Sequence, residues 1–163
     1  MKSIRWAAAS ILLLNIAPAT AAVPAGHFGW LPELAGSCWT ARRPDGERIT
    51  QCYRIEFDRF IRRSIETSGA APMRAESVAV WVGECSEVQF YQWGSSGTPG
   101  LITARLDGDR LIYTNPVPML RQRHIMTRPR GGSFQMIEQT QATGGWVDVS
   151  TLRYVRSGRA PRN

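Results

Sequence analysis

Two cysteines placed symmetrically about a turn constrain this chain more than any other feature. The Pro-Asp-Gly segment at 44–46 suits a three-residue hairpin loop, because proline presets φ for the first turn position and glycine supplies the left-handed one. If Arg43 pairs with Glu47, the antiparallel register places Cys38 opposite Cys52 at a position without backbone hydrogen bonds. Cα atoms lie about 4.5 Å apart at such positions, within disulfide reach of about 4.4–6.8 Å. The sequence therefore predicts a β-hairpin joined by a Cys38–Cys52 disulfide.

A secretory signal peptide is predicted at residues 1–21. Basic residues precede an apolar run over 6–17, and Ala-Thr-Ala at 19–21 forms a small-x-small cleavage site. The run is shorter than the roughly 20 residues that a membrane-spanning helix needs, and no later stretch is long and apolar enough to span. We therefore expect cleavage after Ala21, no transmembrane segment in the mature chain, and a periplasmic or secreted location, where disulfides persist.

The basic residues are almost all arginine. The 163-residue chain carries 20 lysines and arginines against 13 acidic residues, and Lys2 is the sole lysine. The arginines are dispersed and accompany no nucleic-acid-binding motif, so we expect no nucleic-acid partner. An arginine-rich exterior that attracts an anionic partner in the cell envelope is an alternative function, without catalysis.

Turn residues at short intervals divide the rest of the chain into strands. Gly, Pro, Asp and Ser separate segments rich in β-branched and aromatic residues. After a short helical turn at 30–35, we predict ten strands over 37–43, 47–56, 59–67, 75–83, 86–93, 100–106, 109–115, 120–128, 132–141 and 145–156. The mature chain is thereby divided into a lead-in at 22–36, a barrel domain at 37–156 and a flexible basic tail at 157–163.

The short connections determine the expected sheet type. Parallel strands need long crossovers, which this chain lacks, so the sheet must be mainly antiparallel. A sheet of many short strands hides its edges by closing on itself. We predict an all-β fold, an antiparallel up-and-down β-barrel of about ten strands, with a two-sheet sandwich as the alternative.

Alternation along the first hairpin predicts which face is buried. Side chains two residues apart point to the same face, so the two cysteines and the hairpin arginines share a polar face. The disulfide is therefore interpreted as a structural link on the outside, worth about 3 kcal/mol on the chain-entropy account. The other face carries the side chains expected to point into the core, namely Trp39, Ala41, Ile49, Gln51, Tyr53 and Ile55.

Several short motifs are distributed along the mature chain, namely Leu-Ala-Gly-Ser-Cys-Trp at 34–39, Pro-Asp-Gly at 44–46, Cys-Tyr at 52–53, Trp81 with Tyr-Gln-Trp at 91–93, and the closing strand at 145–156. These motifs resemble those of the small secreted bacterial calycin-like domains of uncharacterised function. The resemblance covers nearly all of the mature chain. It implies a lipocalin-like or nitrobindin-like β-barrel with an interior cavity.

Signatures of catalysis and of metal binding are scarce. The Gly-Ser-Ser-Gly-Thr segment at 94–98 lacks the final glycine of a nucleophile elbow and the lysine of a P-loop. No histidine or cysteine spacing fits a metal site, so we expect no metal and no cofactor. A haem, by analogy with nitrobindin, would need an inward histidine, and His124 is the only strand histidine. An enzyme is the least favoured class.

Cys85 is the odd cysteine and is predicted to be a free thiol. Glu84 and Glu87 lie beside it in the sequence. Neighbouring carboxylates raise the pKa of a thiol, which disfavours a reactive thiolate. An inert thiol at a strand end is the favoured interpretation, with a Cys85–His124 dyad or an intermolecular disulfide as alternatives.

Aromatic side chains are the remaining candidates for a ligand site. Tyr91 and Trp93 share one strand face, while Tyr154 and Arg156 share another and could hold a carboxylate at the end of the barrel. The alternative is that the rings only pack the core. We predict a barrel that binds a small, partly apolar ligand in its interior. The predicted ligand-binding set is Trp39, Tyr53, Trp81, Tyr91, Trp93, Tyr154 and Arg156.

Overall fold

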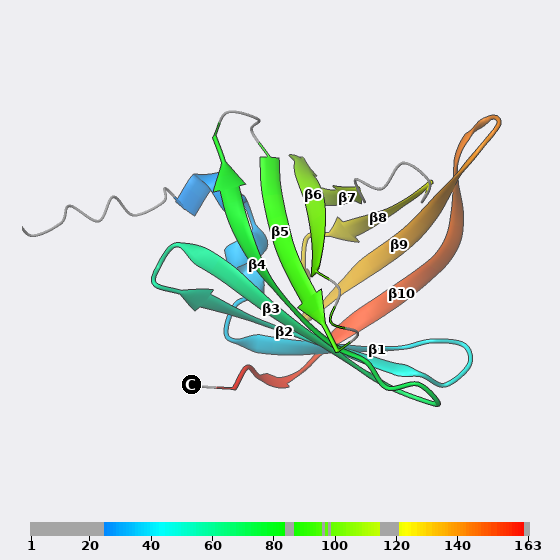
Figure 1. The fold of residues 1–163 in the computed structure, drawn as a ribbon, viewed down its shortest axis with the longest axis horizontal. Coiled ribbons are helices and arrows are strands. Elements are labelled where there is room, and N and C mark those ends of the chain that lie inside the picture. The colour runs from blue at the N-terminus through cyan, green and yellow to red at the C-terminus, as the bar shows by residue number, and fades with distance from the viewer. Residues whose placement is uncertain (1–24, 84–86, 96, 98, 115–120, 162–163) are drawn as a thin grey trace, which may run out of the picture.

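The structure is a computed structural model that describes residues 25–83, 87–95, 97, 99–114 and 121–161. The predicted signal peptide at 1–21, the predicted free thiol Cys85 and the last residues of the predicted tail lie outside the described residues. Ten strands form one closed antiparallel barrel, in which each strand pairs with its neighbours in sequence and the first pairs with the last (Figure 1). The predicted barrel is confirmed, and the sandwich alternative is wrong.

The strands lie close to their predicted bounds. Two 3-10 turns, η1 (Ala25–Phe28) and η2 (Leu31–Leu34), precede them where a single helical turn was predicted. The strands are β1 (Ser37–Arg42), β2 (Arg48–Glu56), β3 (Phe60–Ser68), β4 (Arg74–Val82), β5 (Glu87–Gly94), β6 (Pro99–Asp107), β7 (Arg110–Thr114), β8 (Gln122–Thr127), β9 (Ser133–Ala142) and β10 (Gly145–Arg159).

The last strand is longer than predicted. β10 continues to Arg159, so residues 157–159 belong to the barrel rather than to a flexible tail. These residues pair with the start of β1, where Ser37 lies opposite Arg159. Without them, the start of β1 would present unpaired backbone groups along one edge.

The first hairpin has the predicted register. The backbone N–H of Arg43 donates to the carbonyl of Glu47 at 2.8 Å, and Gly46 adopts the left-handed conformation with φ of +89°. Cys38 lies opposite Cys52, and the two form the disulfide, with Cα atoms 4.0 Å apart. The sequence prediction of this disulfide is confirmed.

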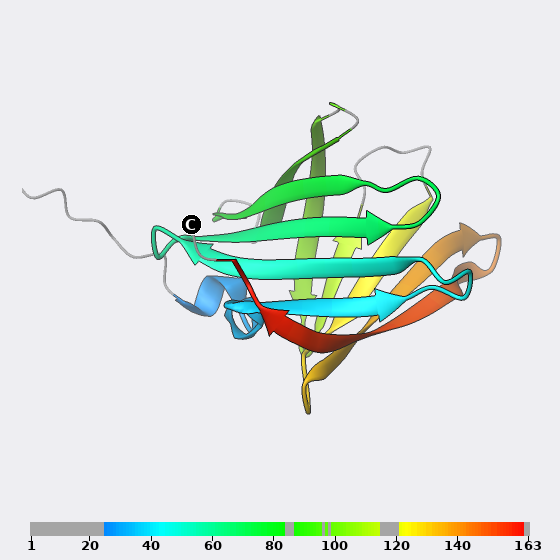
Figure 2. The ribbon, with the colours of Figure 1, turned by 90° about the horizontal axis from the view of Figure 1, so that it is seen from below.

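The two 3-10 turns cover one end of the barrel, which we call the capped end (Figure 2). Leu31 and Leu34 of η2 are fully buried there, together with Trp39 of β1. The indole Nε1 of Trp39 donates to the carbonyl of Leu34 at 3.4 Å. The opposite end, where the β1–β2, β3–β4 and β9–β10 hairpins lie, is called the hairpin end.

Of the six side chains of the first hairpin that were expected to point inward, all but one are buried. Trp39, Ala41, Ile49, Gln51 and Tyr53 are all buried. Ile55, which was expected beside them, is 48% exposed. The pairing of β2 with β1 ends at Tyr53 and Ser37. Ile55 therefore lies beyond the end of β1, where no strand covers it on that side.

Candidate functional site

The barrel is hollow towards its hairpin end, where a cavity of about 300 Å³ opens between the strands. The lining comes from β2, β3 and β5–β10, so most of the barrel wall takes part. The apolar lining residues are Ile49, Ile65, Met73, Ile102, Met136 and Leu152, and the polar ones are Arg43, Gln51, Arg63, Thr67, Gln92, Tyr113, His124, Glu138, Ser150 and Tyr154.

A chain of buried hydrogen bonds runs along one wall of the cavity. The Tyr53 hydroxyl donates to Gln51 Oε1 at 2.6 Å, and Gln51 Nε2 donates to the Tyr154 hydroxyl at 3.0 Å. The Tyr154 ring stacks on Phe134, with ring centroids 4.8 Å apart. Because the Tyr154 oxygen accepts in this chain, its own proton is not used there. Burial raises the pKa of both tyrosines, so the hydroxyls are neutral donors at physiological pH.

Arg63 points from β3 into the cavity and is the one buried cation among the described residues. Its side chain is inside the barrel and only 5% exposed. Its Nε donates to Ser77 Oγ at 3.1 Å and its Nη2 donates to Gln92 Oε1 at 3.3 Å. The guanidinium carbon lies 5.1 Å from the centre of the Phe90 ring and 5.7 Å from that of Tyr113. These are cation–π distances.

The groups around Arg63 are neutral. No ion pair among the described residues involves it. Its sequence neighbour Arg62 points outward and pairs with both Glu56 and Glu76. Burial raises the pKa of Tyr113 to about 12, and the nearby Arg63 charge opposes that rise. Among the described residues, the partners of the Arg63 guanidinium are therefore amide, hydroxyl and ring groups.

A second polar group lies on the β8–β10 side of the cavity. His124 stands across the strands from Glu138, and Ser150 Oγ donates to Glu138 Oε2 at 3.1 Å. Partial loss of hydration lowers the pKa of His124, and Glu138 opposes that shift. In the described part of the chain, no group of three or more histidine, cysteine, aspartate or glutamate residues could hold a metal ion.

Two of the predicted ligand residues lie at the cavity. Tyr154 lines it, and Tyr53 lies beneath Gln51 in the same hydrogen-bonded chain. Tyr91 and Trp93 share a face, as predicted, but that face is the outer one, and they are 49% and 45% exposed. The inward face of β5 instead carries Phe90, fully buried, and so Tyr91 and Trp93 do not reach the cavity.

The other predicted ligand residues lie near the capped end. Trp39 is fully buried beneath η2, and the Arg156 guanidinium lies 5.0 Å from the centre of its ring. Arg156, two positions after Tyr154 on β10, is exposed and is not among the residues that line the cavity. Trp81 packs against His27 of η1, with ring centroids 4.8 Å apart. The predicted set is therefore divided between the core, the outer surface and the cavity.

Of the polar residues that line the cavity, the sequence identified Tyr154 as a ligand residue and Gln51 as inward-facing, but most of the others were missed, above all Arg63. A usable signal was present, because Arg63 stands between Ile61 and Ile65 at two-residue spacing, on the apolar face of β3. A charged residue on an inward face is the exception that points to a function. Gln51 and Gln92 give the same weaker signal on β2 and β5.

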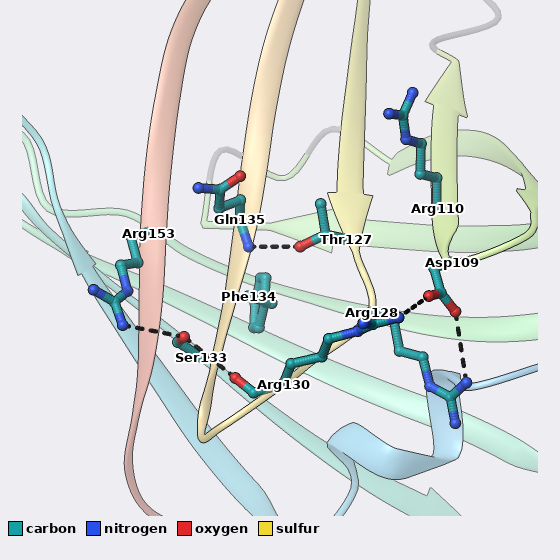
Figure 3. A pocket seen from close by; sticks show the side chains of 9 residues that line it. All are labelled: Asp109, Arg110, Thr127, Arg128, Arg130, Ser133, Phe134, Gln135 and Arg153. Atoms are coloured by element: carbon teal, nitrogen blue, oxygen red, sulfur yellow. Dashed lines mark hydrogen bonds and ion pairs between the residues drawn. The ribbon is translucent and has the colours of Figure 1, made fainter.

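An arginine-rich depression of about 470 Å³ lies on the outer surface, over β7 to β10 (Figure 3). Arg110, Arg128, Arg130 and Arg153 line it. Asp109 pairs with both Arg128 and Arg130, and Glu33 of η2 pairs with Arg128. Arg128 and Arg130 thus have carboxylate partners close by, in contrast to the buried Arg63.

Comparison with known proteins does not assign the chain to a family. No protein-family model and no curated protein matches it. In the described residues, no helix has both the length and the apolar character needed to cross a membrane.

Proposed function

We propose that this protein binds a small, partly apolar ligand in the barrel cavity. The observation that carries the proposal is the cavity itself, whose lining combines aliphatic and methionine side chains with convergent polar groups. Pockets of this composition are the usual sites of small-molecule binding. At about 300 Å³, the volume is at the low end of the range for ligand pockets, which favours a small ligand.

We also propose that the protein is a calycin-like barrel that acts in the periplasm or after secretion. The closed ten-strand meander and the hollow interior support the family proposal. The Cys38–Cys52 disulfide supports an oxidising compartment. Secretion of the full chain, with a new N-terminus found at residue 22 by sequencing, would test the location.

The second candidate function is interaction with an anionic partner of the envelope. The depression that contains Arg110, Arg128, Arg130 and Arg153 favours it, because four arginines there face only two nearby carboxylates. Such binding would weaken steeply with added salt, since exposed charges are screened. Adsorption to anionic vesicles that does not change with salt would exclude this function.

The cavity proposal is tested by filling the cavity from one side. Ile102 lines the cavity from β6, and its neighbour Leu101 points outward. We expect Ile102→Trp to weaken the binding of octanol and octanoate by roughly tenfold or more, because the indole occupies the ligand volume. Leu101→Trp is the matched control and should leave both affinities unchanged.

Isothermal titration calorimetry of the folded variants measures this effect directly, after circular dichroism has shown that each variant retains its sheet. Equal affinities for the Ile102→Trp and Leu101→Trp proteins would place the ligand outside the cavity. An absence of binding by the unsubstituted protein to either amphiphile would count against the proposed function.

A further inference from the structure

Among the residues that the structure describes, Arg63 forms no ion pair, and Glu138 is the one carboxylate that lines its cavity. Moving a charged group out of water is costly unless another charge compensates it. The other arginines whose ion pairs are described, such as Arg62 and Arg128, have carboxylates beside them on the outer surface. Arg63 instead lies inside the barrel among neutral groups. An arginine in these surroundings is suited to bind an anionic ligand.

We propose that the cavity binds an amphipathic carboxylate and that Arg63 is the group that pairs with its head. This proposal rests on the proposed function above and adds the chemical class of the ligand. The planar guanidinium presents its donors in a fork that matches a carboxylate. Arg63 is already oriented by Ser77 and Gln92, so little side-chain freedom is lost when the anion binds.

The strand register gives the direction in which the ligand lies. Arg63 is opposite Tyr53, whereas Ile65 is opposite Gln51 and Thr67 is opposite Ile49, each pair nearer the hairpin end. Arg63 is therefore deeper in the barrel than the isoleucines of the apolar wall. The ligand enters with its carboxylate first, and its apolar chain lies against Ile49, Ile65 and Leu152.

The other polar groups of the cavity favour a single negative charge on the ligand. The Tyr154 hydroxyl lines the cavity and has a proton available for an anionic oxygen. Glu138 also lines the cavity, and its negative charge disfavours ligands with two negative charges. Arg43, the other arginine that lines the cavity, pairs with Glu47. The Arg63 guanidinium, one free hydroxyl proton and the apolar lining residues together fit a monocarboxylate with a short apolar chain.

Three probes of equal chain length, octanoate, octanol and octylammonium, test the inference by titration calorimetry on the folded protein. We expect octanoate to bind about ten- to a hundredfold more tightly than octanol, the effect of one charge-assisted hydrogen-bonded pair, and octylammonium to bind most weakly. Arg63→Met should abolish the preference for octanoate over octanol. Arg105→Met, on the exposed outer face of β6, is the matched control and should retain it.

Thermal unfolding provides a second readout besides calorimetry. Because Arg63→Met removes a buried charge for which no ion pair is found in the described residues, we expect the variant to unfold at the same temperature as the parent protein or higher. Octanoate should raise the unfolding temperature of the parent protein and of Arg63→Lys, which keeps the charge. It should not raise that of Arg63→Met.

The outcomes separate the two proposals. Equal affinity of the parent protein for octanoate and octanol would overturn the carboxylate inference and leave the ligand-binding function standing. A preference for octanoate that survives Arg63→Met would also overturn it, because the anion would then bind elsewhere. Failure of all three probes to bind would overturn both proposals together.

Discussion

The capped end and the hairpin end of this barrel are filled in different ways. At the capped end, Leu31, Leu34 and Trp39 exclude water completely, and the aromatic ring of Phe134 packs against Trp39 with centroids 5.3 Å apart. At the hairpin end, the same sheet encloses a cavity into which Arg63 points. One continuous sheet thus provides a solid region and a hollow region.

This difference indicates that the capped end contributes mainly to the stability of the fold and the hairpin end mainly to ligand binding. Close packing at the capped end gains dispersion and hydrophobic free energy from every buried side chain. The hairpin end gains less from packing, and its cavity contains Arg63, a buried cation for which no ion pair is found in the described part of the chain. We expect substitutions at the two ends to separate into effects on folding and effects on ligand binding.

The largest expected effect is a loss of stability from Trp39→Ala at the capped end. Removing this fully buried indole should lower the free energy of unfolding by about 3–5 kcal/mol. Leu152→Ala at the cavity should lower it by only roughly 1 kcal/mol, because that side chain is partly buried and already faces empty space. Urea denaturation measures both values, and similar losses would contradict the division between the two ends.

A smaller loss of stability is expected when the disulfide is removed. Replacing Cys38 and Cys52 together by serine should lower the free energy of unfolding by about 3 kcal/mol, because the unfolded chain regains its freedom. The bond lies on the outer face, so the octanoate affinity of the folded variant should not change. A tenfold loss of affinity in calorimetry would show that the disulfide also shapes the cavity.

The smallest expected effect is on the pH dependence of stability, through His124 at the hairpin end. Its pKa is lowered in the folded state, so the unfolded chain binds more protons at acid pH. Stability should therefore fall as the pH falls from about 6.5 towards the folded-state pKa. Unfolding temperatures of the parent protein and of His124→Gln should converge above that range and diverge below it. Parallel curves would mean that His124 keeps an ordinary pKa.

The fold could be predicted from sequence because turns and alternation are local properties. The Pro-Asp-Gly turn determines the register of the first hairpin, and the register places Cys38 beside Cys52. The C-terminal end of β10 was harder to predict from the sequence. Residues 157–159 carry no strong strand pattern of their own, and they are extended because the start of β1 needs a partner.

The site was harder to predict because both faces of several strands carry apolar residues. Tyr91 and Trp93 were the natural choice on β5, yet Phe90 occupies the inward face and leaves them outside. Arg63 was overlooked because arginine is usually exposed on strands. Whether an inward arginine has a carboxylate partner depends on side chains from other strands, and no pattern within β3 contains that information.

The pairing of β1 with β10 has a consequence for how the chain reaches its folded state. Every other strand pairing in the described residues joins strands that are consecutive in sequence, so each can form by closing a short loop. The β1–β10 seam joins distant residues, such as Thr40 and Ser157, which are 117 positions apart. The entropy of bringing distant parts of the chain together is thus concentrated at one seam. A meander that assembles hairpin by hairpin becomes a barrel, and encloses its cavity, only when that seam forms.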